Sequence, residues 1–365
     1  MKYFVILSTL IACFAQANVQ FKHEEIAFMN QFYLKQGEQL SNQQTQSRLE
    51  TLSFHLDLAK QKAPTLLNRV SNVGFSTRYH KKRYMLSLLN ANISAEAKIK
   101  LAITKEELMQ LLGDYPADGN ADLAFINTLS MPLSGEYTLA DAYQDASMQA
   151  RFNLHQGDIN QLTELTNIDV QYQLIKQHYT NKHVRWQVLE NLSISQAITP
   201  ALLSHLGVKA SLHNESPYLD KLKTQITPSE IKQYYNQNKQ QFRYSAQVTA
   251  AIVSFKSHEA AQSKIKNEKA LQQILANKKR LIPRAALNNS FINQAAFNLS
   301  TKQGPTLLRT PINEWVIIQV FDKKYDYYSE KSETVKYQAT SALAQAQAKE
   351  NYATAKKRWQ QGTSL

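Results

Sequence analysis

Apolar residues recur at helical spacing between residue 21 and about residue 240, with polar turns between the apolar runs and little of the alternation that is typical of strands. One run places four apolar residues at i, i+3, i+7 and i+10, so that they share one face of a helix: Leu49, Leu52, Leu56 and Ala59. Pro64 ends this helix because a proline cannot donate the next backbone hydrogen bond. The simplest prediction for this part of the chain is an all-helical segment.

Helix starts are marked by a side-chain oxygen at the N-cap, often with Glu or Gln three residues later or with proline at the first helical position. Four starts are predicted, at Thr104, Asp158, Thr199 and Thr227. Glu107 and Gln161 follow the first two at the capping-box distance, whereas Pro200 and Pro228 directly follow the last two. Gly113 is placed to end the helix that begins after Thr104.

The hydrophobic period changes near Gln247. Residues 248–253, with the sequence VTAAIV, alternate between the two faces of a strand, and residues 315–320, WVIIQV, form a β-branched apolar run. Residues 260–281 lie between them, are rich in Lys, Gln and Ala, and are predicted to be helical. The last thirty residues return to a helix whose small apolar side chains are expected to lie in a groove of the helical part.

These patterns predict an α+β fold class. We expect a mostly helical N-terminal domain over residues 18–245, a small inserted α/β domain over residues 246–328, and a C-terminal helix over residues 329–365 that packs on the helical domain and completes it. A length of 365 residues is enough for two or three domains of ordinary size.

Composition excludes several classes of protein. Nine glycines are few for this length, and neither G-x-x-x-x-G-K-[ST] nor G-x-G-x-x-G occurs, so nucleotide enzymes of the usual kinds are excluded. The single cysteine, Cys13, leaves no partner for a disulfide and no thiolate set for zinc. Neither H-E-x-x-H nor G-x-S-x-G is found. We therefore expect no metal and no cofactor, and the nine histidines are interpreted as surface or core residues.

The first 17 residues have the pattern of a secretory signal peptide. Lys2 precedes an apolar stretch over residues 3–12, and Ala15-Gln16-Ala17 forms a small-x-small cleavage site that would leave Asn18 first. The stretch is too short for a membrane-spanning helix. Leu10-Ile11-Ala12-Cys13 also resembles a lipobox, in which Cys13 would be lipidated. Both alternatives place the protein outside the cytoplasm, and we expect a periplasmic location.

A net charge of +13, from 42 Lys and Arg against 29 Asp and Glu, favours acidic partners such as anionic membrane surfaces or negatively charged unfolded chains. Nucleic acid is not an expected partner of an exported protein. The densest basic run, residues 79–84 (YHKKRY), is interpreted as a solvated helix face. Asp141 and Asp145, four residues apart, are interpreted in the same way. Membrane attachment is expected only if Cys13 is lipidated.

Several tracts in the second half of the chain resemble those of a known family. Residues 227–242, TPSEIKQYYNQNKQQF, lead into the predicted strand at 248–253 and a helix near Ala260. Residues 295–299, AAFNL, are followed by RTP at 309–311 and by VIIQV at 316–320. In this order the tracts resemble the parvulin-type prolyl isomerase domains of exported chaperones such as SurA, PpiD and PrsA. The helical N-terminal part with a returning C-terminal helix is similar to the chaperone core of SurA.

The sequence departs from this family at the positions that carry activity. The family has a histidine on the first strand, where this chain has Ala251. The second family histidine falls at Val316 or Trp315, depending on the placement of a one-residue insertion. The glycine-rich GGDLG turn of the family has no counterpart between Leu281 and Phe291. The resemblance therefore implies a degenerate parvulin-like domain, and we assign no catalytic residue.

The resemblance implies a folding factor that binds unfolded or exported polypeptides, with outer-membrane proteins as possible clients, without ATP and without prolyl isomerase activity. An active peptidyl-prolyl isomerase and a dedicated scaffold of an envelope secretion or assembly system are the alternatives. If the parvulin-like pocket still binds peptide, its apolar candidates are Phe291, Phe297 and Leu299, since the matching tract of the family borders the proline pocket. The same three residues are also compatible with a role in the core.

Overall fold

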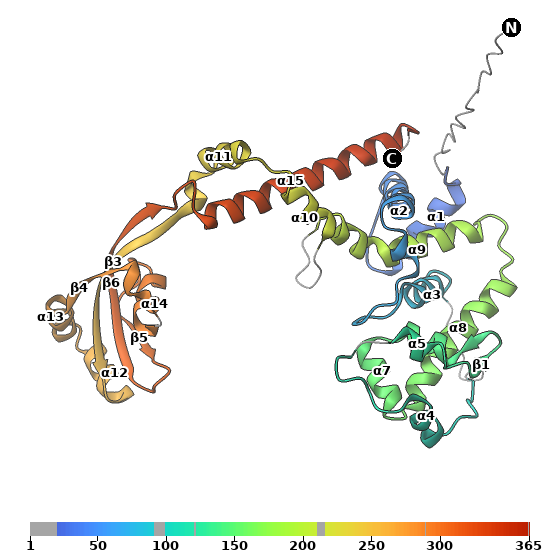
Figure 1. The fold of residues 1–365 in the computed structure, drawn as a ribbon, viewed down its shortest axis with the longest axis horizontal. Helices are drawn as coiled ribbons and strands as arrows, with labels where there is room; N and C mark the ends of the chain where they lie inside the picture. The colour runs from blue at the N-terminus through green and yellow to red at the C-terminus, as the bar shows by residue number, and fades with distance from the viewer. Residues whose placement is uncertain (1–19, 91–98, 120–121, 210–215, 289, 364) are drawn as a thin grey trace, which may run out of the picture. The chain divides into compact units, whose positions relative to one another are not determined.

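The chain divides into two compact units in the computed structural model (Figure 1), which describes residues 20–90, 99–119, 122–209, 216–288, 290–363 and 365. Unit 1 consists of Met1–Leu222 with Gln345–Leu365, and unit 2 consists of Lys223–Ala344. The fold is α+β, with about 60% helix and small antiparallel sheets. The signal peptide predicted at residues 1–17, with Cys13, lies outside the described residues.

Unit 1 contains a helical layer built on two long helices that pack on each other, α2 (Asn42–Lys62) and α9 (Trp186–His205). The layer also contains α1 (His23–Lys35), the 3-10 helix η1 (Pro64–Asn68) and α3 (Thr77–Leu88). Helices α2 and α3 both contact α9. The shared face predicted for α2 is buried, since Leu49 and Ala59 are fully enclosed and Leu52 and Leu56 are nearly so.

The middle of unit 1 forms a second cluster of shorter elements. They are α4 (Lys105–Leu112), α5 (Leu123–Ile126), β1 (Pro132–Ser134), β2 (Tyr137–Thr138), α6 (Leu139–Asp145), α7 (Met148–His155) and α8 (Ile159–His178). Leu108, Leu154 and Leu162 are fully buried in one core cluster with side chains of α3 and α6. The β1–β2 hairpin corrects the all-helical prediction, and Gly135, with a φ of +55°, provides the left-handed residue in its turn.

The C-terminal helix α15 (Glu333–Gln360) supplies the last part of the unit 1 core. Tyr352 and Trp359 pack with Phe54 of α2, and the centroids of the Phe54 and Tyr352 rings are 5.4 Å apart. A short helix, α10 (Pro217–Lys223), lies at the end of the first part of unit 1, and its Tyr218 accepts a hydrogen bond from Asn351 of α15. Small and aromatic residues of α15 thus fill the space beside α2 and α9.

Unit 2 is built on a four-stranded antiparallel sheet with the strand order β4-β3-β6-β5. Its elements are α11 (Pro228–Gln237), η3 (Lys239–Phe242), β3 (Arg243–Phe255), α12 (His258–Lys266), α13 (Glu268–Asn277), β4 (Lys279–Pro283), η4 (Arg284–Leu287), α14 (Phe291–Asn298), β5 (Thr306–Arg309) and β6 (Trp315–Tyr327). Tyr235, Phe242 and Val335 join α11 to the start of α15, so unit 2 extends beyond the small domain expected at residues 246–328.

The two faces of this sheet carry different apolar clusters, as strand alternation requires. Val248, Ala250 and Val316 pack with Phe297 of α14 on one face. Ala251 and Ile317 pack on the other face, in a cluster with Leu271 and Leu275 of α13.

Three of the four predicted helix starts are confirmed. The Thr104 side chain accepts a hydrogen bond from the Glu107 N–H, and Gly113 ends α4 with a φ of +64°. Asp158 caps α8, and Thr227 forms a reciprocal capping box with Glu230 at the start of α11.

The start predicted at Thr199-Pro200 is wrong, because Pro200 lies inside α9. The Thr199 hydroxyl donates to the Ser195 carbonyl at 2.7 Å, so it does not cap a helix. Ile198 and Leu202, on either side of the proline, are buried in the core with Trp359, and this burial keeps the helix continuous despite the missing N–H.

The helix predicted over residues 260–281 is divided. Asn267 ends α12 and caps α13 by accepting a hydrogen bond from the Ala270 N–H, and Leu281 lies in strand β4. Pairing of Lys279–Pro283 with β3 determines this boundary, and a helical composition does not report such non-local pairing. In the described part of the chain, no helix combines the length and apolar character needed to cross a membrane.

Candidate functional site

A groove of about 1070 Å³ lies in unit 1 between the η1–α3 loop and helix α9. Its apolar lining comes from distant parts of the sequence: Leu66, Val70, Val73, Phe75, Ile198 and Ala201. Its polar and basic lining includes Arg69, Ser71, Asn72, His80, Gln196 and Lys209. The volume is at the upper end of the range of ligand pockets, about 300 to 1,000 Å³.

Hydrogen bonds on its buried side hold the loop that forms the wall of the groove. The Thr77 N–H donates to the Arg69 carbonyl at 3.0 Å, and the Ser71 hydroxyl accepts from the Gly74 N–H at 2.9 Å. The Met148 N–H donates to the Val73 carbonyl at 3.0 Å. With these backbone groups paired, the wall is a preformed surface.

Arg151 of α7 contributes to the same wall from beneath it. Its side chain is fully buried, with Nη2 donating to the Ser71 carbonyl at 2.7 Å and Nε donating to the Tyr143 carbonyl at 3.0 Å. Burial lowers the pKa of this guanidinium, although the nearby Tyr143 opposes the shift. Its Nη1 has no hydrogen-bond partner in the described part of the chain. Arg151 therefore connects α7 to the loop through carbonyl oxygens.

The groove combines exposed apolar surface with positive charge. The Val73 side chain is 72% exposed, and the Phe75 ring stacks on Tyr79 with centroids 4.1 Å apart. Arg69, His80 and Lys209 are all exposed, and no carboxylate lies among the described residues that line the groove. Partial desolvation of the ring, together with the charge of Arg69, lowers the pKa of His80. The groove can hold an extended chain with apolar and acidic side chains.

A second cavity in unit 1, of about 670 Å³, is lined by an ionic network. Lys82 Nζ lies 2.7 Å from Asp169 Oδ1 and 3.5 Å from Asp145 Oδ2. Arg78 pairs with Asp145 and with Asp141, at 2.9 and 2.6 Å. Although burial acts to raise the pKa of Asp141, hydrogen bonds from Thr138 and Arg78 lower it.

Lys81 completes this network by pairing with Glu190 at 3.0 Å, and the Tyr172 hydroxyl donates to the same carboxylate at 2.6 Å. The prediction of a solvated face is wrong for Tyr79, which is buried in the core cluster of this region. It is also wrong for Lys82 and Asp145, which are 4% and 1% exposed. They are buried because α3, α6 and α8 pack around them and each charge has an opposite partner. The acidic and basic side chains in the walls of this cavity neutralise one another, and this arrangement is suited to a structural role.

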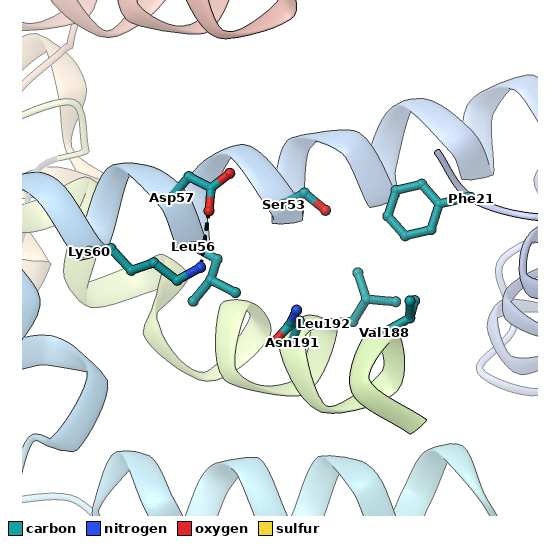
Figure 2. A pocket seen from close by; sticks show the side chains of 8 residues that line it. All are labelled: Phe21, Ser53, Leu56, Asp57, Lys60, Val188, Asn191 and Leu192. Carbon is teal, nitrogen blue, oxygen red and sulfur yellow. Dashed lines mark hydrogen bonds and ion pairs between the residues drawn. The ribbon is translucent and has the colours of Figure 1, made fainter. Parts of the chain in front are cut away.

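A third cavity, between α2 and α9, is shown in Figure 2. Its volume is only about 80 Å³, and Phe21, Leu56 and Val188 are among its lining residues. Asp57 and Lys60 form an ion pair of 3.1 Å at its edge, which Figure 2 draws as a dashed line. Space of this size is suited to a few water molecules and not to a polypeptide.

The three apolar candidates in unit 2 do not share one environment. Phe297 is buried in the cluster between α14 and the sheet, and Leu299 is half-buried against the same cluster. Phe291, the first residue of α14, is 39% exposed. Phe297 and Leu299 therefore act as core residues, and Phe291 remains available to a ligand.

The positions that correspond to the two histidines of the parvulin pattern lie on β3 and β6, the two central strands of the sheet. Ala251 and Trp315 lie on the face covered by α13, whereas Val316 lies on the α14 face. Trp315 is thus the position that shares a face with Ala251. His258 at the start of α12 packs on Trp315, with ring centroids 4.3 Å apart. A histidine on a helix therefore contacts the strand position at which the family has its second histidine.

In the ranges that the structure describes, no group of three or more His, Cys, Asp or Glu side chains is arranged to hold a metal ion. Comparison of the chain with family models, with curated proteins and with solved structures gives no match.

Sequence reasoning did not find the groove. Its lining residues lie in η1, in the following loop, in α3 and in α9, and the first and last of them are more than 140 positions apart, Leu66 and Lys209. The one local signal was Val73, an apolar residue between Asn72 and Gly74 in a polar loop.

Proposed function

We propose that the protein is a SurA-like periplasmic folding factor that binds unfolded or exported polypeptides without ATP and lacks prolyl isomerase activity. The observation that carries this proposal is the groove of unit 1, which is wide and partly apolar, and whose charged lining residues among those described are all cationic. A protein that holds unfolded chains needs a surface that contacts apolar segments without strict sequence demand.

The charges of the groove also support reversible capture. Arg69 and Lys209 attract acidic segments over several ångströms, and the exposed Val73 and half-buried Phe75 contact apolar side chains that an unfolded chain exposes. Such contacts are individually weak, so the client is released without an energy source.

The resemblance of unit 2 to a parvulin domain stays part of the proposal. Its tracts occur in the expected order, with residues 248–253 in β3, residues 295–298 in α14 and residues 316–320 in β6. Isomerisation needs polar groups that favour a twisted amide over a planar one, across a barrier of about 18 to 20 kcal/mol. Ala251 and Trp315 supply no imidazole at the matching positions, which favours a binding role for the domain.

Two assays on the full chain test this function. One follows suppression of the aggregation of an unfolded outer-membrane protein, and the other follows catalysis of a proline-limited refolding reaction. We expect suppression without catalysis. Catalysis would favour an active isomerase, and no effect in either assay would favour a dedicated scaffold.

Variants of the groove distinguish client binding at this site from nonspecific binding elsewhere on the protein. Val73→Asp and the pair Arg69→Glu with Lys209→Glu are expected to weaken suppression at least about fivefold, since they remove apolar contact and reverse the charge of the rim. Leu34→Asp and the pair Lys62→Glu with Lys182→Glu make the same changes at exposed positions of unit 1 outside the groove. Equal losses in both sets would show that the groove is not the binding site.

A further inference from the structure

The positive charge of the chain is concentrated in unit 2. Residues 223–344 contain 18 Lys and Arg against 8 Asp and Glu, whereas the rest of the chain contains 24 against 21. Unit 2 therefore carries most of the net charge of +13 in about a third of the length. A field of this kind acts on polyanionic surfaces.

Strands β3 and β6 continue beyond the rest of the sheet as a two-stranded ribbon (Figure 1). Strand β4 pairs with β3 only over residues 247–251, so residues 243–245 of β3 pair with β6 alone. Arg243 lies opposite Tyr327 and Ser245 lies opposite Tyr325. Opposite residues of an antiparallel pair share a face, so a cation and two tyrosines lie together on this ribbon.

Two cations are held on tyrosine rings of this face. The guanidinium carbon of Arg243 lies 3.7 Å from the centroid of the Tyr325 ring, and Lys239 Nζ lies 5.1 Å from the centroid of Tyr327. Neither cation has a carboxylate partner within the described ranges, and the exposed Lys324 and Asp326 lie on the opposite face of the ribbon. A guanidinium fixed by stacking keeps its N–H groups free for an oxyanion and loses less entropy when it binds one.

A third cation is built into the base of the ribbon. The Arg284 side chain lies over the Tyr244 ring at 4.8 Å and donates hydrogen bonds to the Tyr328 hydroxyl at 3.0 Å and the Ser245 carbonyl at 3.3 Å. The ring centroids of Tyr244 and Tyr328 are 4.5 Å apart. Arg284 therefore lies with Tyr244 on the face of the ribbon opposite Arg243, the face that also carries the exposed Asp326.

We propose that this cation–tyrosine ribbon, defined by Lys239, Arg243, Tyr325 and Tyr327, docks the protein on a membrane surface that contains anionic phospholipids. Phosphate oxygens of the headgroups match the free N–H groups of the cations. The tyrosine rings have an apolar body and a polar hydroxyl, which is the combination favoured at a membrane–water interface. A membrane offers apolar depth beside its charge, and a soluble acidic polymer does not. This contact is reversible, requires no lipid on Cys13, and does not rest on the proposed chaperone function.

Vesicle flotation of the full chain tests the proposal, with Cys13→Ser in every sample so that lipidation cannot contribute. One set of vesicles contains phosphatidylcholine alone, and the other contains about one third phosphatidylglycerol. The test variant is Lys239→Gln with Arg243→Gln. The matched control, Lys62→Gln with Lys182→Gln, removes the same charge from exposed positions of unit 1.

We expect binding only to the anionic vesicles, a loss of at least about tenfold in the test variant, and a change within about twofold in the control. Tyr325→Ser is expected to weaken binding, and Tyr325→Phe to retain most of it, because the ring positions Arg243. Equal losses in the test and control variants would overturn the proposal. Tighter binding to polyglutamate or single-stranded DNA than to the anionic vesicles would overturn it as well.

Discussion

The indole Nε1 of Trp359 donates a hydrogen bond to Asp57 Oδ2 at 3.1 Å, across 302 positions of the sequence. This bond fixes the end of α15 to the C-terminal part of α2, in the cluster that also contains Phe54 and Tyr352. The C-terminal residues of the chain are therefore part of the core of unit 1.

A double-mutant cycle with Trp359→Phe and Asp57→Ala measures this bond. We expect a coupling free energy of about 1 kcal/mol, since a partly buried hydrogen bond contributes about that much. The measurement is urea unfolding with Trp315→Phe in every variant, so that Trp186, which lies in unit 1, reports the transition. The exposed Lys60, which pairs with Asp57, gives a matched control: Lys60→Gln is expected to change stability by less than about 0.5 kcal/mol. A coupling near zero would contradict the structural importance of the bond.

Stability of unit 1 is expected to depend on pH through His55. Its Nδ1 lies 2.9 Å from Thr199 Oγ1, its Nε2 lies 2.7 Å from the Tyr352 hydroxyl, and burial with the charge of Lys356 lowers its pKa to about 4. Because the folded pKa lies below the ordinary value of 6.5, stability is full above pH 6.5 and falls as the unfolded chain takes up a proton between pH 6.5 and 4.

Full protonation of His55 is expected to lower the free energy of unfolding by about 3 kcal/mol. Urea unfolding at pH 7.5 and at pH 4.5 measures it. His55→Leu is expected to be less stable at pH 7.5 but to lose much less on acidification, whereas the exposed-site control His178→Gln keeps the full loss. The same loss in His55→Leu as in the parent chain would show that another group is responsible.

Lys82 is expected to be essential for the stability of unit 1. Lys82→Met leaves the carboxylates of Asp145 and Asp169 without this cation in a buried site, and we expect a loss of about 3 to 5 kcal/mol. The neighbouring Arg83 is exposed, so Arg83→Met is expected to change stability by less than about 0.5 kcal/mol. The measurement is the urea midpoint of unfolding of each variant, and similar midpoints for the two variants would contradict the importance of the buried network.

Restoring the family histidine at position 251 is expected to destabilise unit 2. Ala251 is fully buried against Leu271 and Leu275, so Ala251→His overpacks this cluster and buries an imidazole, at a cost of about 2 to 4 kcal/mol. Ser254→His places the same side chain at an exposed position of β3 and is expected to be tolerated. Hydrogen exchange of the β3 amides measures both variants. Unchanged protection in Ala251→His would show that the site has room for a catalytic group.

Local chemistry determined most of the elements of this protein. The apolar face of α2, the capping box of α4 and the apolar alternation of β3 all depend on contacts within a few residues, so periodicity and side-chain type were sufficient to predict them. The α+β class followed from the change of period near Gln247. Position 251 carries no histidine whatever the fold, and this too is a property of the sequence alone.

Only the tertiary structure decided where these elements meet. Pro200 lies inside a helix because Ile198 and Leu202 are both buried by packing against α15, and Lys82 is enclosed because carboxylates from two other helices reach it. The groove joins Val73 to Ile198, and the ribbon joins Arg243 to Tyr325. Burial and charge pairing of this kind depend on residues far apart in the chain, and their free energy outweighs local preference, which is why the sequence pattern predicted the helices and strands but neither surface.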